Sequence, residues 1–134
     1  MESWQLRRAA NWVNLSTPLG LLAAHLAGAE ISRGRNGTHV ASGYPHPWPA
    51  ASAFTVGSVV VTRHSREWLE CRPALLAHEE RHAWQYALCG GLPFLPLYAA
   101  AAAYSRWRTG DHASANLFER RAGLADGGYT LIRR

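Results

Sequence analysis

The sequence contains no lysine; all of its 14 basic residues are arginine. The arginines are scattered along the chain, often in pairs such as Arg7-Arg8 and Arg120-Arg121, and do not form one concentrated patch. Nucleic-acid binding usually depends on such a patch or on a recognised binding module, and the sequence has neither. We therefore expect no nucleic acid among its partners. The formal net charge of +5 is compatible with a mild attraction to anionic lipid.

Cysteine is scarce as well, with only Cys71 and Cys89. If the segment between them is helical throughout, they lie roughly 27 Å apart, whereas a disulfide requires Cα atoms within about 7 Å. The two thiols are therefore not expected to pair, and they lack the Cys-x-x-Cys spacing of a structural zinc site. We expect them to act as small buried apolar groups. Free thiols fit a reducing compartment, so the sequence favours a cytoplasmic protein.

A long uninterrupted apolar segment is also missing. Residues 86–105 carry no charge, but Gly90, Gly91, Pro93 and Pro96 break the run. Only about thirteen residues can continue as one helix, roughly 20 Å long, against a hydrocarbon thickness of about 30 Å. We expect a core helix that starts at a proline, with peripheral membrane contact as the alternative.

The strongest chemical signal is a His-Glu-x-x-His motif, which begins at His78 and ends at His82. On a helix, histidines four residues apart lie on one face with Cβ atoms about 5–6 Å apart, so both imidazoles can bind one zinc ion. Glu79 projects about 100° further around the helix and can reach a metal-bound water without being a ligand. It is the candidate general base.

The motif lies in a segment that has clear helix boundaries. Pro73 fits the first turn of a helix, and Gly90-Gly91 ends it, so we predict a helix over residues 73–89. Its apolar residues occupy most of its sides, which is typical of a helix buried between two layers. Two buried histidines and a buried glutamate require partners, and a divalent cation supplies one.

The remaining segments predict a single α+β domain over residues 1–134. We expect helices within residues 1–29, with Thr17 as the N-cap of the second helix and Pro18 in its first turn. Residues 30–64 predict a small antiparallel or mixed sheet, with a hairpin around Asn36-Gly37.

Within that sheet, residues 53–63 read as the best strand, with Gly57 at a bulge or turn. The chain then continues into the metal-binding helix and into C-terminal helices within residues 93–123. The last of these is predicted to start with Asp111 as its N-cap and to stop at Gly123.

Two parts of the chain resemble the zincin metallopeptidases. The strand at 54–61, followed by Ala-His-Glu-x-x-His-x-x-Gln at 77–85, is similar to small bacterial zincin domains. The segment Asn-x-x-Glu-x-x-Ala at 116–122 is similar to gluzincin-like proteins, including the minigluzincins, whose glutamate is the third zinc ligand. The resemblance covers residues 54–123, about half of the chain. The His-x-x-Gly-x-x-His extension of the metzincins is absent.

This resemblance implies that His78, His82 and Glu119 bind Zn²⁺ and that Glu79 activates the water. Two imidazoles and one carboxylate leave an open coordination position, which suits catalysis. The implied function is that of a zinc metallopeptidase, with a peptide or protein as substrate. The alternative is a non-catalytic zinc-binding scaffold or a membrane-surface module.

Several assignments stay open at the level of sequence. Asn116 and Glu119 also match a capping box, in which the glutamate would satisfy a backbone N–H group; Asp111 and His112 are then the substitute ligands. Gln85, one turn beyond His82, either contacts a ligand or substrate or makes a buried hydrogen bond.

Two further side chains could polarise a substrate carbonyl, namely His112 and Tyr129. The oligomeric state is not indicated by the sequence.

Overall fold

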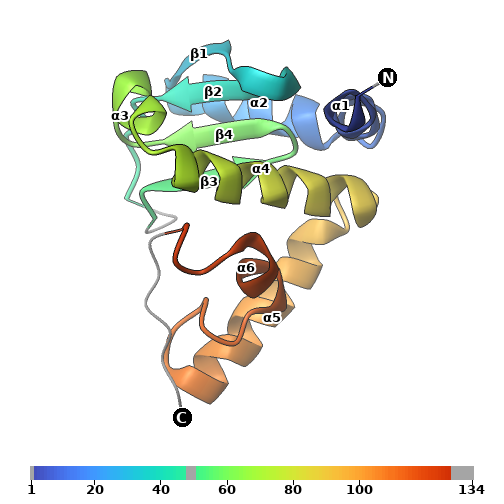
Figure 1. Cartoon of the computed structure of the whole chain (residues 1–134), viewed down its shortest axis with the longest axis vertical. Helices are drawn as coiled ribbons and strands as arrows, with labels where there is room; N and C mark the ends of the chain where they lie inside the picture. The colour runs from blue at the N-terminus through green and yellow to red at the C-terminus, as the bar shows by residue number, and fades with distance from the viewer. Residues whose placement is uncertain (1, 48–50, 128–134) are drawn as a thin grey trace.

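The computed structural model describes residues 2–47 and 51–127. It confirms the α+β class: a four-stranded sheet lies between helices, and the last two helices extend away from it (Figure 1). In chain order the elements are α1 Ser3–Val13, α2 Ser16–Ala27, β1 Glu30–Arg33, the short 3₁₀ helix η1 Arg35–Gly37, β2 His39–Ser42, β3 Ala53–Val56, β4 Val59–Thr62, α3 Arg66–Glu70, α4 Pro73–Leu88, α5 Phe94–Thr109 and α6 Leu117–Ala122.

The sheet is mixed, with the strand order β1-β2-β4-β3. It consists of two antiparallel hairpins, β1-β2 and β3-β4, joined by a parallel pairing in which Val40 of β2 lies opposite Val60 of β4. This arrangement leaves β1 and β3 as the edge strands of the sheet.

Successive side chains of β4 point to opposite faces of the sheet, so this strand contributes to the core on both faces. Val59 and Val61 pack with Ala24 of α2 on one face, whereas Val60 packs with Leu69 of α3 on the other. Each fully buried side chain of this kind contributes about 1.5–3 kcal/mol. Figure 1 shows the same layers, with α2 behind the sheet and α4 in front of it.

Residues 53–63 do not form one strand, but the turn predicted as one alternative for Gly57 is confirmed: it divides the segment into β3 and β4. Gly57 has a φ of +63°, which glycine adopts without strain. A Cβ atom there would lie 2.4 Å from the backbone of Ser16 and Thr17. Close packing of this turn against the start of α2 therefore requires glycine.

The hairpin predicted around Asn36-Gly37 is present as the β1-β2 pair. Both residues have positive φ values, 53° and 72°. The connection is nevertheless longer than a two-residue turn, because η1 lies within it.

The start of α2 differs from the prediction. The helix begins at Ser16 with Leu15 as its N-cap residue, not at Pro18 with Thr17 as the cap. The Thr17 hydroxyl instead accepts a hydrogen bond at 3.1 Å from the backbone N–H of Ser58, in the β3-β4 turn. The Thr17 hydroxyl, which the local sequence pattern predicts to cap the helix, therefore makes a tertiary hydrogen bond instead.

Helix α5 is longer and more exposed than the predicted core helix. Only Phe94, Ser105 and Thr109 are buried in it, and Figure 1 shows the helix leading away from the sheet, with α6 beside it. The core-helix prediction is therefore wrong. Among the described residues, no helix combines the length and apolar character needed to cross a bilayer.

The last helix, α6, starts five residues later than predicted, since its N-cap is Asn116 and not Asp111. Asp111 does not cap a helix; its carboxylate accepts hydrogen bonds from the N–H groups of Ala113 and Ser114 at 2.8 and 2.7 Å and so forms a turn. Asn116 is the N-cap of α6, and the helix ends before Gly123 as predicted.

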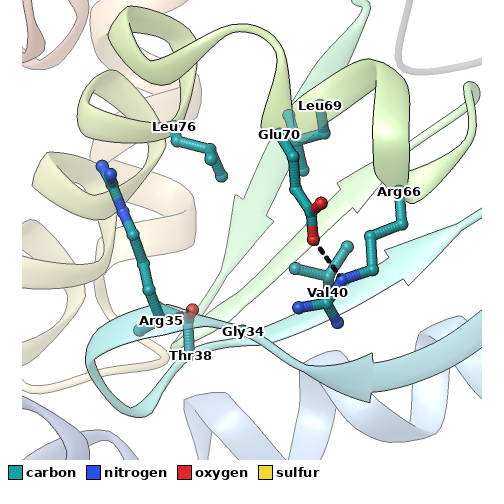
Figure 2. A pocket seen from close by; sticks show the side chains of 8 residues that line it. All are labelled: Gly34, Arg35, Thr38, Val40, Arg66, Leu69, Glu70 and Leu76. Atoms are coloured by element: carbon teal, nitrogen blue, oxygen red, sulfur yellow. Dashed lines mark hydrogen bonds and ion pairs between the residues drawn. The ribbon is translucent and has the colours of Figure 1, made fainter.

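A small cavity lies between α3, α4 and the β1-β2 connection (Figure 2). Its volume is about 80 Å³, and the Arg66–Glu70 ion pair lies at its wall. Small-molecule sites typically enclose about 300–1,000 Å³. The cavity is therefore too small for such a ligand, and it lies apart from the His-Glu-x-x-His motif.

Candidate metal centre

Helix α4 carries the His-Glu-x-x-His motif and runs from Pro73 to Leu88, close to the predicted 73–89. Pro73 occupies the first turn, where its missing N–H group has no helical partner to lose. The helix packs against α1, β3 and α6, so it is covered on several sides. This confirms the burial between layers expected from its apolar sides.

Three buried side chains from two helices, α4 and α6, converge at this site. His78 and His82 come from α4, and Glu119 comes from α6. One ligand atom of each lies within 4.8 Å of the others, and their side chains form the one such group of three or more found in the described residues. The three residues are 1%, 6% and 2% exposed. A site assembled from positions so far apart in the sequence is a tertiary feature.

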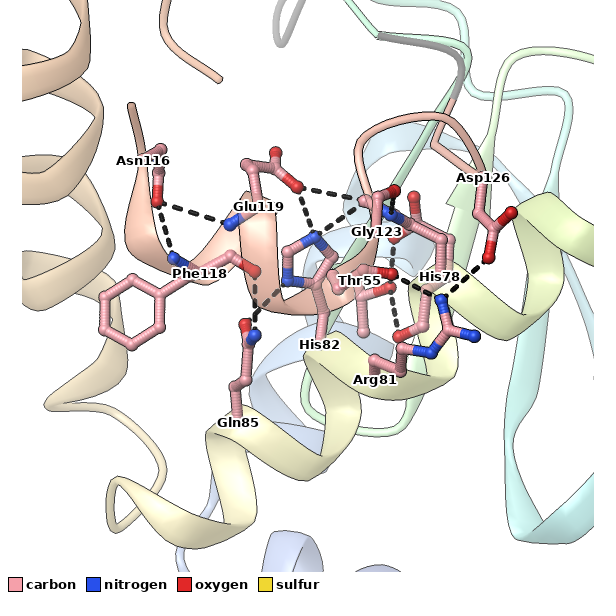
Figure 3. Close-up of polar contacts among 12 residues, drawn as sticks. Thr55, His78, Arg81, His82, Gln85, Asn116, Phe118, Glu119, Gly123 and Asp126 are labelled. Carbon is pink, nitrogen blue, oxygen red and sulfur yellow. Dashed lines mark hydrogen bonds and ion pairs between the residues drawn. The ribbon is translucent and has the colours of Figure 1, made fainter. Parts of the chain in front are cut away.

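The imidazoles are oriented by hydrogen bonds on their outer nitrogens (Figure 3). His78 Nδ1 lies 2.7 Å from the carbonyl oxygen of Gly123, and His82 Nδ1 lies 2.8 Å from Gln85 Oε1. Both partners are acceptors, so each Nδ1 carries the hydrogen. In a neutral ring of this tautomer, the lone pair of Nε2 points inward, as in metal-binding histidines.

The inner atoms form a tight triangle of electron-pair donors. The Nε2 atoms of His78 and His82 are 3.1 Å apart and lie 3.0 and 2.6 Å from Glu119 Oε1. Three such atoms require a positive charge between them, from a proton or a metal ion. Two neutral imidazoles and one carboxylate are a known ligand set for zinc. The donor set therefore fits a divalent cation.

The pKa shifts of Glu119 and His82 also favour a positive charge at this site. Burial acts to raise the pKa of Glu119, but hydrogen bonds with His78, His82 and Tyr98 hold it well below its ordinary range. Burial acts to lower the pKa of His82, but the hydrogen bond with Glu119 and its charge raise it above the ordinary value. The Glu119 carboxylate therefore favours a positive charge on its neighbours.

Glu119 is held by two residues outside the group. Asn116 caps α6 by accepting from the N–H groups of Phe118 and Glu119, at 2.9 and 3.4 Å. The Tyr98 hydroxyl, from α5, donates to Glu119 Oε2 at 2.5 Å. Asn116 therefore makes the cap that the sequence suggested, while the Glu119 carboxylate is directed to the histidines.

Glu79 lies next to the centre but outside the ligand group. Its side chain is 3% exposed, and its Oε2 accepts a hydrogen bond at 2.6 Å from the hydroxyl of Thr55, on β3. Burial raises the pKa of the Glu79 carboxyl group, although the nearby charge on His82 opposes this. A carboxylate in this state is suited to take up a proton.

Of the remaining candidates, Gln85 has a clear structural role. It accepts from His82 and donates from Nε2 to the Phe118 carbonyl at 2.8 Å, which ties α4 to α6. Asp111 and His112 are not members of the ligand group. Tyr129 lies outside the described residues.

The turn at 123–127 closes the centre on one side. Arg81 donates to the Ala122 carbonyl at 2.5 Å and to Asp126 Oδ2 at 2.9 Å, so this turn is fastened to α4. Gly127 is so close to the imidazole of His78 that a Cβ atom would lie 2.6 Å from Cε1. Access to the centre from this side requires the turn to move.

Comparisons with protein-family models, curated proteins and solved structures give no match.

Proposed function

We propose that the protein is a zinc-dependent hydrolase of peptide bonds, in which His78, His82 and Glu119 hold the metal and Glu79 is the general base. The observation that carries the proposal is the convergence of two Nε2 atoms and one carboxylate oxygen. A second carboxylate, that of Glu79, lies outside this group but is near enough to interact electrostatically with both histidines. Ligand sets of this composition leave an open position, which is the mark of catalytic zinc sites.

Glu79 has the properties of a general base. A zinc ion bound here would polarise a carbonyl group and lower the pKa of water. Glu79 then accepts the proton that the attacking water loses and transfers it to the leaving amine. The hydrogen bond from Thr55 fixes the position of one oxygen of this carboxylate. Its position outside the ligand group keeps it available for proton transfer.

The position of β3 favours a peptide as the substrate. Thr55, which contacts Glu79, belongs to this strand, and β3 forms one edge of the sheet. An extended peptide can add to a sheet edge through backbone hydrogen bonds. A substrate aligned in this way lies close to the general base.

The burial of the centre favours a second candidate, a structural zinc site without catalytic activity. The ligands are at most 6% exposed, and the turn at 123–127 covers His78. Metal binding would then contribute to folding by joining α4 to α6. The two candidates differ in what Glu79 does.

A Glu79→Gln variant separates the candidates. For the peptidase, the variant retains zinc and fold but loses hydrolysis of casein and of a mixed peptide library by about 10²–10⁴-fold. The matched control is Glu80→Gln, since Glu80 lies next in the helix but pairs with Arg35 at 2.6 Å. Equal turnover in wild type and Glu79→Gln would refute the assigned role. A fully zinc-loaded wild type that cleaves no peptide in the library would support the structural site.

A further inference from the structure

Helix α5 exposes apolar side chains over more than half of its circumference. Leu95, Leu97, Tyr104 and Trp107 are 40%, 49%, 54% and 76% exposed. At about 100° per residue, Leu95 and Leu97 mark the two ends of an arc of about 200°, and Tyr104 and Trp107 lie within it. We name these four residues the apolar arm. Isolated exposed apolar side chains are common, but a continuous surface of this kind indicates a binding function.

A second group of exposed apolar residues lies where α5 begins. Gly91 is so close to Asn14 that a Cβ atom there would lie 2.3 Å from Asn14 Cγ, so the α4-α5 turn adjoins the α1-α2 turn. These two turns carry the apolar rim, whose members are Val13, Leu15, Leu88 and Leu92, exposed by 83%, 57%, 78% and 39%. Figure 1 shows both turns at the same end of the molecule. The arm and the rim thus join at the start of α5.

We propose that the apolar arm and the apolar rim bind the surface of an anionic membrane. The charge of α5 fits this partner. Its charged residues are Arg106 and Arg108, which follow the uncharged part of the helix and lie on either side of Trp107. By the same helical geometry, the two arginines lie near the two edges of the apolar arc, with Trp107 between them. Arginine and tryptophan at the border of an apolar surface are typical of helices at the lipid headgroups.

The distribution of apolar residues favours lipid over a protein partner. A second helix packs along one stripe of its neighbour, whereas lipid solvates a wide arc, and the arc on α5 covers about 200°. The length of the helix sets the depth of binding. Sixteen residues extend about 24 Å, less than a hydrocarbon thickness of about 30 Å. The arm therefore lies in the interface and does not cross the bilayer.

Co-sedimentation of the zinc-loaded, 134-residue chain with vesicles tests this proposal. Wild type should bind vesicles of phosphatidylcholine with about 30% phosphatidylserine more strongly than vesicles of phosphatidylcholine alone. The variant Leu97→Gln/Trp107→Gln should lower the partition coefficient by about tenfold for each side chain. Arg106→Gln/Arg108→Gln should lower binding to the anionic vesicles by about fivefold for each arginine.

The control is Leu26→Gln, because Leu26 is also exposed, by 76%, but lies at the far end of α2. It should bind as wild type does. Circular dichroism and zinc content verify that each variant is folded. Absence of vesicle binding by wild type, or equal binding by wild type and the arm variant, overturns the proposal. Self-association without vesicle binding, measured by light scattering, also overturns it and assigns the surface to a second copy of the chain.

Discussion

Replacing Tyr98 with phenylalanine removes one hydroxyl group from the border of the proposed metal centre. That hydroxyl donates to Glu119 Oε2 at 2.5 Å. The ring itself packs near Phe94 and Phe118, with centroid distances of 5.8 and 6.4 Å. Phenylalanine keeps this packing, so the substitution isolates the effect of the hydroxyl on the Glu119 carboxylate.

The expected effect is a loss of zinc affinity. Removing a partner that orients a metal ligand typically weakens affinity by about 10–100-fold, or about 1.4–2.7 kcal/mol. Glu119 is 2% exposed, so water has little access to the carboxylate in place of the lost hydroxyl. We therefore expect the upper part of this range for Tyr98→Phe.

Competition for zinc with a chromophoric chelator measures the affinity directly. Tyr104→Phe is the matched control, since Tyr104 lies on the same helix but is 54% exposed. Zinc affinity should fall for Tyr98→Phe and stay unchanged for Tyr104→Phe. Wild-type affinity in Tyr98→Phe would refute the inference that α5 takes part in holding the third ligand.

The centre and its supporting turns give three further expectations. Thr55→Val should lower turnover by about 10–100-fold at unchanged zinc content, because a hydrogen bond to a charged group contributes about 1.5–3 kcal/mol. Thr55→Ser keeps the hydroxyl and should keep most activity; equal kinetics for both variants would contradict this. Zinc at a hundredfold excess over its Kd should stabilise the fold by about 2.7 kcal/mol and raise the Tm by about 10 °C in calorimetry, and a Tm insensitive to chelator would argue against a folded-state metal site. Gly91→Ala should lower the free energy of unfolding in urea by about 1–3 kcal/mol, which is more than the effect of Gly90→Ala. A Cβ atom at Gly91 would clash with Asn14, whereas one at Gly90 would meet nothing within 4 Å. Equal destabilisation by the two variants would contradict the packing of the two turns.

The sequence predicts those features of the site that depend only on residues close together in the chain. The spacing of His78 and His82 follows from one helical turn, and the bounds of that helix follow from Pro73 and the glycines after it. Only the family resemblance indicates Glu119 as a ligand, and the structure places its carboxylate against both imidazoles. That contact joins residues about forty positions apart, so periodicity alone could not reveal it.

The supporting residues were missed for the same reason. Thr55 lies in a segment that was recognised as a strand, but its contact with Glu79 depends on how that segment folds into a hairpin and which face meets α4. Tyr98 looked like one aromatic residue of an apolar run. Its role depends on the direction of α5, which the local pattern does not specify.

The errors in the fold have a common physical cause, which is competition between local signals and tertiary contacts. Thr17 is a good N-cap residue, but its hydroxyl bonds to the β3-β4 turn. Asp111 is also a good N-cap residue, but it forms a turn with Ser114, and Asn116 caps the helix instead. In each case the side chain satisfies backbone N–H groups, though not those that the sequence pattern indicated.

The proposed function requires that two imidazoles of α4 and the carboxylate of Glu119 hold one metal ion. Metal analysis combined with X-ray absorption spectroscopy of the native protein tests it most directly. We predict one zinc per chain, with only nitrogen and oxygen ligands at about 2.0–2.2 Å, and loss of that zinc in Glu119→Ala. A protein without bound metal, or one with sulfur ligands at about 2.3 Å from Cys71 or Cys89, would contradict the account.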